Sequence, residues 1–125
     1  FDDAIYTAAR MVEILSADAR ASSAVFADLP TREHDLNYTL PMTAIDAVKF
    51  IARLAELAIF PEGKITCMDC LRVDFADGWG IARPSKSMPG VVLRFEADNK
   101  EALIRIRDGF KQYMTDAKPG MKIPF

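Results

Sequence analysis

The sequence holds a single histidine, His34, and only two cysteines, Cys67 and Cys70. Structural zinc sites usually take four Cys or His ligands, and catalytic zinc sites take at least three protein ligands. With one histidine and no second cysteine pair, nitrogen and sulfur ligands alone cannot complete such a site. We therefore predict that these residues hold no metal of their own.

Long apolar runs are also missing. No stretch approaches the roughly 20 apolar residues that a helix needs to cross a bilayer. The first residues, Phe1-Asp2-Asp3, are acidic, whereas a secretory signal begins with basic residues. The abrupt start, without Met, suggests a piece of a longer chain. We expect a cytoplasmic protein without membrane contact, whose thiols stay reduced.

No block of basic residues occurs either, since 16 basic and 18 acidic residues give a net charge of −2. Nucleic-acid binding depends on clustered Lys and Arg that neutralise backbone phosphates. We therefore expect no nucleic-acid partner. A small anionic ligand fits this composition, because one local Arg can hold a phosphate on a nearly neutral protein.

The apolar spacing divides the chain into a short helical part and a larger mixed part. Residues 2–15 carry apolar side chains at helical spacing, and residues 23–29 predict a further short helix. Residues 31–36 are polar and aperiodic, which predicts a hinge between a segment 1–30 and a domain 37–125. About 30 residues are too few to bury a core, so the first segment should pack on other sequence.

The domain over residues 37–125 has the order strand, helix, three or four strands, helix. Alternating apolar and polar residues predict strands at 36–40, 64–67, 71–75, 79–83 and 91–97. This order predicts the α+β class, with an antiparallel sheet of about four strands and two helices on one face.

Three local signals place the turns and helix starts of this domain. The pairs Thr43 with Asp46 and Asp98 with Glu101 resemble capping boxes and predict the first turns of the two helices. Asp77-Gly78 predicts a hairpin between two of the strands.

Cys67 and Cys70 form a Cys-x-x-Cys motif, and Asp69 between them is typical of a turn. The pair should therefore flank a tight hairpin. Redox motifs of this kind usually open a helix, which favours two reduced structural thiols. A redox or metal-binding domain built on the pair is the alternative.

One loop combines chemical groups that bind anions: Arg83-Pro84-Ser85-Lys86-Ser87-Met88-Pro89-Gly90. The Arg83 guanidinium can hold a phosphate through two parallel charge-assisted hydrogen bonds. Ser85 and Ser87 offer hydroxyl donors, Lys86 adds a second cation, and amides of a tight turn also bind anions. The same composition is equally typical of a plain solvent-exposed connection.

The stretch from Asp77 to Pro89, with residues 91–97 after it, resembles the C-terminal domain signature of the α-D-phosphohexomutases, the phosphomannomutase/phosphoglucomutase family. In that family the loop runs Arg, any residue, Ser, Asn, Thr, any residue, Pro. Phe60-Pro61-Glu62-Gly63 and Leu71-Arg72-Val73-Asp74 also resemble family sequence, and residues 1–6 resemble the helix after the family's sugar-recognition loop. The resemblance covers almost the whole chain.

Residue by residue, Arg83 and Ser85 match the family pattern. Ser87 stands where Thr is usual, and Lys86 stands where Asn is usual. Cys70 stands where the family commonly has Gly. These departures concern the subfamily and the preferred substrate more than the fold.

The resemblance implies a fold like that of the TATA-binding protein, without its DNA binding, and makes residues 1–30 the last helices of a preceding third domain. It implies that Arg83, Ser85, Lys86 and Ser87 bind the non-transferred phosphate of a hexose phosphate. The domain would then close over the sugar during phosphoryl transfer between C1 and C6.

The resemblance also implies a phosphoserine, Mg²⁺ and a hexose 1,6-bisphosphate activator, all belonging to upstream domains. We therefore expect no catalytic residue within these 125 residues. Two alternatives stay open at this point. One is a phosphoglucosamine mutase of the same family, and the other is a non-catalytic module that binds a partner protein through the first helix.

Overall fold

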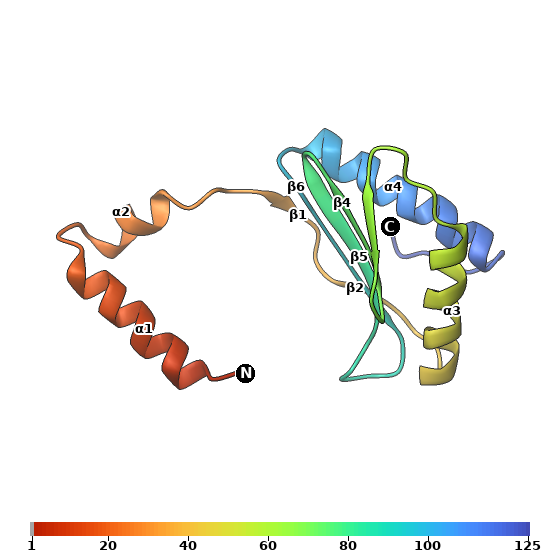
Figure 1. The fold of residues 1–125 in the computed structure, drawn as a ribbon, viewed down its shortest axis with the longest axis horizontal. Coiled ribbons are helices and arrows are strands. Elements are labelled where there is room, and N and C mark those ends of the chain that lie inside the picture. The colour runs from red at the N-terminus through yellow and green to blue at the C-terminus, as the bar shows by residue number, and fades with distance from the viewer. Residues whose placement is uncertain (1) are drawn as a thin grey trace. The chain divides into compact units, whose positions relative to one another are not determined.

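The computed structural model describes residues 2–125 and divides into two units, Phe1–Thr31 and Arg32–Phe125 (Figure 1). Phe1, where the predicted first segment begins, lies outside the described residues. The first unit contains α1 (Ala4–Ala17) and α2 (Ser22–Ala27), and neither helix buries a residue. Helical spacing thus predicts both helices correctly, but their apolar faces have no core within this unit.

Short-range polar contacts order the first unit. The Asp3 carboxylate caps α1 by accepting a hydrogen bond from the Tyr6 amide at 2.8 Å. Between the helices, the Arg20 guanidinium pairs with Asp18 at 2.8 Å and with Asp28 at 2.6 Å. Hydrogen bonds from Arg20 lower the pKa of the Asp18 carboxyl below its ordinary value.

The second unit is an antiparallel sheet with helices on one face, as Figure 1 shows. The strand order is β1-β6-β5-β4-β3, and β2 also pairs with β6. The α+β class predicted from the sequence is confirmed, and two short strands on β6 extend the four longer ones. The strands are β1 (Glu33–His34), β2 (Tyr38–Leu40), β3 (Lys64–Cys67), β4 (Leu71–Phe75), β5 (Gly78–Pro84) and β6 (Val91–Ala97), and the helices are α3 (Ala44–Leu57) and α4 (Lys100–Ala117).

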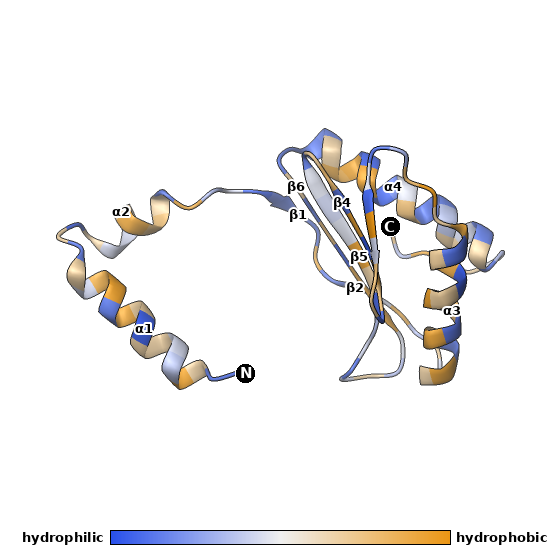
Figure 2. Cartoon of the chain, in the orientation of Figure 1, coloured by the Kyte–Doolittle hydropathy of each residue, from blue (hydrophilic) through white to orange (hydrophobic). Residues whose placement is uncertain are grey.

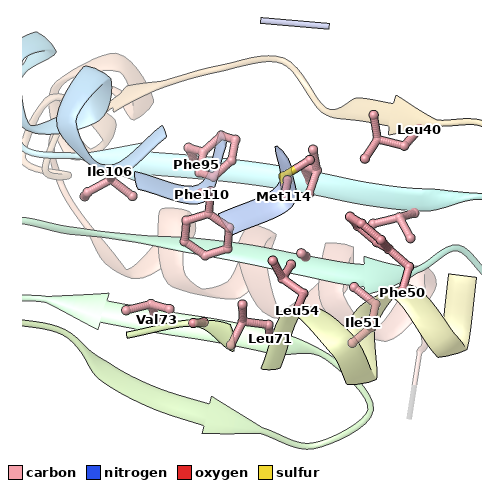
Figure 3. Close-up of a cluster of buried hydrophobic side chains, with 14 of the residues drawn as sticks. Leu40, Phe50, Ile51, Leu54, Leu71, Val73, Phe95, Ile106, Phe110 and Met114 are labelled. Carbon is pink, nitrogen blue, oxygen red and sulfur yellow. The ribbon is translucent and has the colours of Figure 1, made fainter. Parts of the chain in front are cut away.

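Alternate residues of β4, β5 and β6 are buried against the two helices, and the others point to the opposite, more polar face. Figure 2 shows the corresponding apolar side of α3. In the core, the Phe95 ring from β6 meets the Phe110 ring from α4 edge-on, with centroids 5.2 Å apart (Figure 3). The predicted apolar stripe of α4 is fully inside this core and comprises Leu103, Ile106, Phe110 and Met114.

The predicted cap of α3 is confirmed: Thr43 Oγ1 accepts a hydrogen bond from the Asp46 amide at 3.1 Å. The predicted cap of α4 is wrong by one residue. Asn99 caps the helix, accepting from the Ala102 amide at 2.9 Å. Asp98 makes other contacts: its amide donates to Asp77 O at 2.9 Å, and its carboxylate pairs with Arg32 at 3.3 Å.

The predicted hairpin at Asp77-Gly78 forms with a shifted boundary, since Phe75 pairs with Gly78 and the two-residue turn is Ala76–Asp77. Gly78 therefore belongs to β5. A Cβ there would lie 2.6 Å from the Glu96 carbonyl oxygen, so the glycine serves close strand packing and not the turn itself.

The segment 31–36, predicted as a polar hinge, contains β1. Glu33 and His34 pair with Ala97 and Glu96 of β6, and the Asp35 amide donates to Phe95 O at 3.3 Å. Both β1 side chains are exposed, so this strand has no apolar alternation that the sequence could reveal. Within residues 2–125, no helix is long and apolar enough to span a membrane.

Candidate functional site

The β5–β6 loop closes tightly on itself. Pro84 and Val91 are registered partners, and the Ser85 amide donates to Gly90 O at 2.8 Å. Gly90 has a φ of 150°, and a Cβ on it would lie 2.6 Å from the Leu40 carbonyl oxygen. Only glycine fits here, so the loop is held against the end of β2.

A cavity of about 420 Å³ lies between this loop and β2. It brings together all four residues that the sequence and the family resemblance singled out. Arg83 comes from the end of β5, and Ser85, Lys86 and Ser87 come from the loop. The complete lining is Asn37, Thr39, Arg83, Ser85, Lys86, Ser87, Met88 and Val92.

Ser85 organises the loop internally. Its Oγ lies 3.5 Å from Ser87 Oγ and accepts a hydrogen bond from the Met88 amide at 3.3 Å. Both hydroxyls therefore face one region of the cavity and can donate to one bound group. The Oγ–Oγ distance is long for a hydrogen bond, so a ligand oxygen competes with a weak contact only.

Arg83 differs from the other arginines of this unit. Arg72 pairs with Asp74 at 2.6 Å, and Arg105 pairs with Asp77 at 2.6 Å. Across residues 2–125 no ion pair is recorded for Arg83 or Lys86, and both side chains are exposed. Arg83 Nη1 makes one long hydrogen bond, 3.4 Å to Pro84 O. Its positive charge is therefore uncompensated by carboxylates and available to an anion.

Sequence reasoning did not include Asn37 and Thr39 among the site residues. Thr39 lies opposite Val92 in the β2–β6 ladder, which places it beside the loop. The alternation over residues 36–40 puts Asn37 and Thr39 on one side of a strand. Nothing in that local pattern tells which sheet edge the strand joins, because its partner lies 53 positions later.

Cys67 and Cys70 are free thiols flanking the β3–β4 turn, as predicted. Asp69 between them has a φ of 55°, the left-handed conformation that Asp tolerates in turns. Among the residues that the structure describes, no group of three or more His, Cys, Asp or Glu side chains is arranged to hold a metal ion.

Comparisons with known proteins identify the family of this chain. Residues 37–112 match the family model described as phosphoglucomutase/phosphomannomutase, C-terminal domain. The chain belongs to this family. The resemblance noted from the loop sequence is thereby confirmed, and the matched residues contain the whole cavity lining.

Individual relatives align over nearly the full chain. A phosphomannomutase/phosphoglucomutase from Pseudomonas aeruginosa is 40% identical over 125 residues, which cover all of this chain and 27% of that protein. A phosphoglucomutase from Neisseria meningitidis is 44% identical over 115 residues, covering 89% of this chain and 24% of that protein. The chain thus spans about a quarter of the length of these curated relatives.

A solved structure shows the same fold. The crystal structure of a phosphoglucomutase/phosphomannomutase family protein from Burkholderia thailandensis superposes with a TM-score of 0.87 at 41% identity. It covers all of this chain and 26% of that one. The helices and the sheet of this chain therefore have counterparts in one longer family member.

Proposed function

We propose that the domain over residues 37–125 binds the non-transferred phosphate of a hexose phosphate, and closes over the sugar, in a longer phosphohexomutase. The observation that carries this proposal is the cavity that joins Arg83, Ser85, Lys86 and Ser87 on one closed loop. It has two cations without carboxylate partners and two hydroxyls facing the same space.

Each residue supplies a distinct contact to the phosphate. The planar Arg83 guanidinium matches two phosphate oxygens with two parallel hydrogen bonds. Ser85 and Ser87 donate neutral hydrogen bonds, and Lys86 contributes a flexible point charge. These contacts break no bond. They fix the substrate's position and stabilise its negative charge, which is how such a domain contributes to phosphoryl transfer.

The exposed apolar residues of the first unit support the proposal that this chain is part of a longer protein. Ile5 of α1 is 84% exposed and Val12 is 66% exposed, although both lie on its apolar face. We assign residues 1–30 to the last helices of a preceding domain, which would cover that face. Residues 31–36 would form the hinge, with bending concentrated at Thr31 and Arg32 because β1 pairs with β6 from Glu33 onward.

The remaining chemistry of the proposed enzyme lies in its upstream domains. Those domains would supply the phosphoserine, the Mg²⁺ site and the site for a hexose 1,6-bisphosphate activator. Residues 2–125 present no cluster of metal ligands, so no step of this proposal passes through a metal on this chain.

A titration followed by amide chemical shifts tests the proposal. Glucose 6-phosphate and mannose 6-phosphate should shift the amide signals of residues 83, 85–88 and 90, whereas unphosphorylated glucose should not. Glucosamine 6-phosphate in the same series compares the phosphoglucosamine mutase alternative. A sugar response that is independent of the phosphate, or shifts confined to other parts of the chain, would contradict a phosphate site.

The exposed apolar face of α1 also favours a second candidate, a module that binds a partner protein. Deleting residues 1–30 separates the two functions. A partner-binding module loses its partner after the deletion, while the phosphate response of residues 83–90 is retained if the loop site is real.

A further inference from the structure

The β3–β4 turn lies beside the β5–β6 loop, residues 84–90, which we call the phosphate loop. Leu71 and Ala82 are the last registered pair between β4 and β5 at this end of the sheet. One step further along these antiparallel strands, Cys70 comes next to Arg83, and then Asp69 comes next to Pro84. Figure 1 shows the β3–β4 turn and the β5–β6 loop at the same end of the sheet.

Both thiols line a second cavity, of about 340 Å³, between this turn and α3. Four α3 side chains, Val48, Ile51, Ala52 and Ala55, form its apolar wall. Pro84, which begins the phosphate loop, also lines it. The two cysteines therefore open into one space, and that space is bounded by the residue that follows Arg83.

The cysteines differ in access to solvent. Cys67, the last residue of β3, is exposed, whereas Cys70, just before β4, is half-buried. Only Met68 and Asp69 separate them, and the turn is already tight because Asp69 adopts a φ of 55°. A disulfide requires Cβ atoms about 3.8 Å apart and sulfurs about 2.05 Å apart, a span that a two-residue spacer can close.

We propose that Cys67 and Cys70 form a redox-responsive dithiol whose conversion to a disulfide changes the geometry of the adjacent phosphate loop. The oxidant is a small-molecule disulfide. The Cys67 thiolate attacks one of its sulfurs, forming a mixed disulfide and releasing one thiol. The Cys70 thiolate then attacks the Cys67 sulfur and releases the second thiol. One external disulfide is thus reduced to two thiols while the dithiol is oxidised.

Ring closure alters the loop through backbone contacts. The turn that must move to bring the sulfurs together is the neighbour of Arg83 and Pro84 on β5. Pro84 has a fixed φ and transmits a displacement of its backbone to Ser85. The cavity between the phosphate loop and β2 has its present shape with both thiols free. Oxidation that changes this shape should therefore weaken anion binding. This part of the inference rests on the proposed function, whereas disulfide formation does not.

The first test equilibrates the protein in glutathione buffers spanning about −320 to −180 mV and measures its mass after acid quenching. We expect the parent protein to lose two hydrogens without keeping a glutathione adduct. Cys67→Ser and Cys70→Ser are the matched controls, and each should stop at a mixed disulfide or the free thiol. Stable glutathione adducts on the parent, or no oxidation over this range, would overturn the proposal.

The second test measures coupling to the loop. Oxidation of the parent should shift the amide signals of residues 83, 85–88 and 90, and neither serine variant should show that change. An intramolecular disulfide that leaves those amides unmoved overturns the coupling. This readout needs no ligand, so it decides the inference even if the reduced protein fails to bind phosphate, an outcome that would count against the proposed function alone.

Linkage supplies a quantitative check with inorganic phosphate as the probe. If oxidation weakens phosphate binding about tenfold, a typical coupling between sites, saturating phosphate must favour the dithiol by the same factor. The dithiol's reduction potential should then rise by about 30 mV in phosphate, relative to chloride at equal ionic strength. An unchanged potential in a protein that binds phosphate would contradict the coupling.

Discussion

Gly90 approaches the backbone of Leu40 so closely that a Cβ on Gly90 would lie 2.6 Å from the Leu40 carbonyl oxygen. This contact joins the end of the β5–β6 loop to β2, the two elements that enclose the candidate phosphate cavity. The loop is therefore held from both sides, by its own Ser85–Gly90 hydrogen bond and by this packing.

Gly90→Ala should consequently destabilise the domain and displace the loop. A non-glycine residue at a φ of 150° costs about 1–3 kcal/mol, and the collision with Leu40 adds to it. Urea unfolding measures the loss. Gly120→Ala is a matched control, because Gly120 has a φ of 80° but nothing within 4 Å of its added Cβ. An equal or larger loss for Gly120→Ala would show that the contact with Leu40 does not matter.

Local patterns predict the long elements of this domain well. The expected strands at 64–67, 71–75 and 91–97 coincide with β3, β4 and β6. In β4 and β6 one face is buried, so the apolar alternation is strong, whereas all four β3 residues are exposed. The α4 stripe is predicted for the same reason, since burial of one helix face imposes a regular apolar spacing.

Local sequence patterns do not predict the structural features that depend on partners far away in the sequence. β1 has two exposed side chains, and only its backbone pairing with β6 makes it a strand. Asn37 and Thr39 reach the candidate site because β2 joins β6, a long-range choice. Phe125, which follows the last helix, packs on Tyr38 with ring centroids 4.7 Å apart. The four loop residues could be predicted because they lie within five consecutive positions of the sequence.

The cap of α4 gives a direct test of one corrected assignment. Asn99→Ala should cost about 1 kcal/mol of unfolding free energy, because the Ala102 amide loses its acceptor. Asp98→Ala should cost less, since it removes only an exposed ion pair with Arg32. Thermal unfolding of the two variants and of Asn99→Ser, which keeps a capping oxygen, makes the comparison. A larger loss for Asp98→Ala would restore the cap predicted from the sequence.

Hydrogen exchange should separate the two ends of the proposed hinge. The Asp35 amide donates to Phe95 O, whereas no hydrogen bond from the Thr31 amide is recorded among residues 2–125. We therefore expect slower amide exchange at Asp35 than at Thr31. The polar composition of residues 31–36 predicts uniformly fast exchange instead. Equal rates at the two positions would mean that β1 does not persist in solution and that the whole segment bends.

Mutase turnover should be absent from this chain by itself. The family resemblance places the phosphoserine and the metal site upstream of Phe1, so conversion of glucose 1-phosphate to glucose 6-phosphate should stay at background. The assay contains Mg²⁺ and glucose 1,6-bisphosphate, with a complete family enzyme as the positive control. Turnover that co-purifies with the chain and disappears in Arg83→Ala would place chemistry, and not only binding, on this domain.

Arg83 should supply the largest single contact to a bound phosphate. A hydrogen bond to a charged group contributes about 1.5–3 kcal/mol, so Arg83→Ala should weaken hexose 6-phosphate binding about tenfold to a few hundredfold. Arg83→Lys should recover only part of this loss, because an ammonium cannot reproduce the planar pair of bonds. Ser85→Ala and Ser87→Ala should each cost about 1 kcal/mol as neutral donors.

The fold should survive the loss of Arg83, because its side chain is exposed and makes one hydrogen bond of 3.4 Å. Arg53→Ala is the matched control: Arg53 is an exposed α3 arginine paired with Glu56 at 3.2 Å and lies outside the cavity. It removes the same charge from the protein, so any general electrostatic effect on anion binding appears in both variants. A specific site requires that Arg83→Ala lose affinity and Arg53→Ala keep it. Equal losses of affinity in the two variants, or no loss in either, would mean that the loop does not bind phosphate.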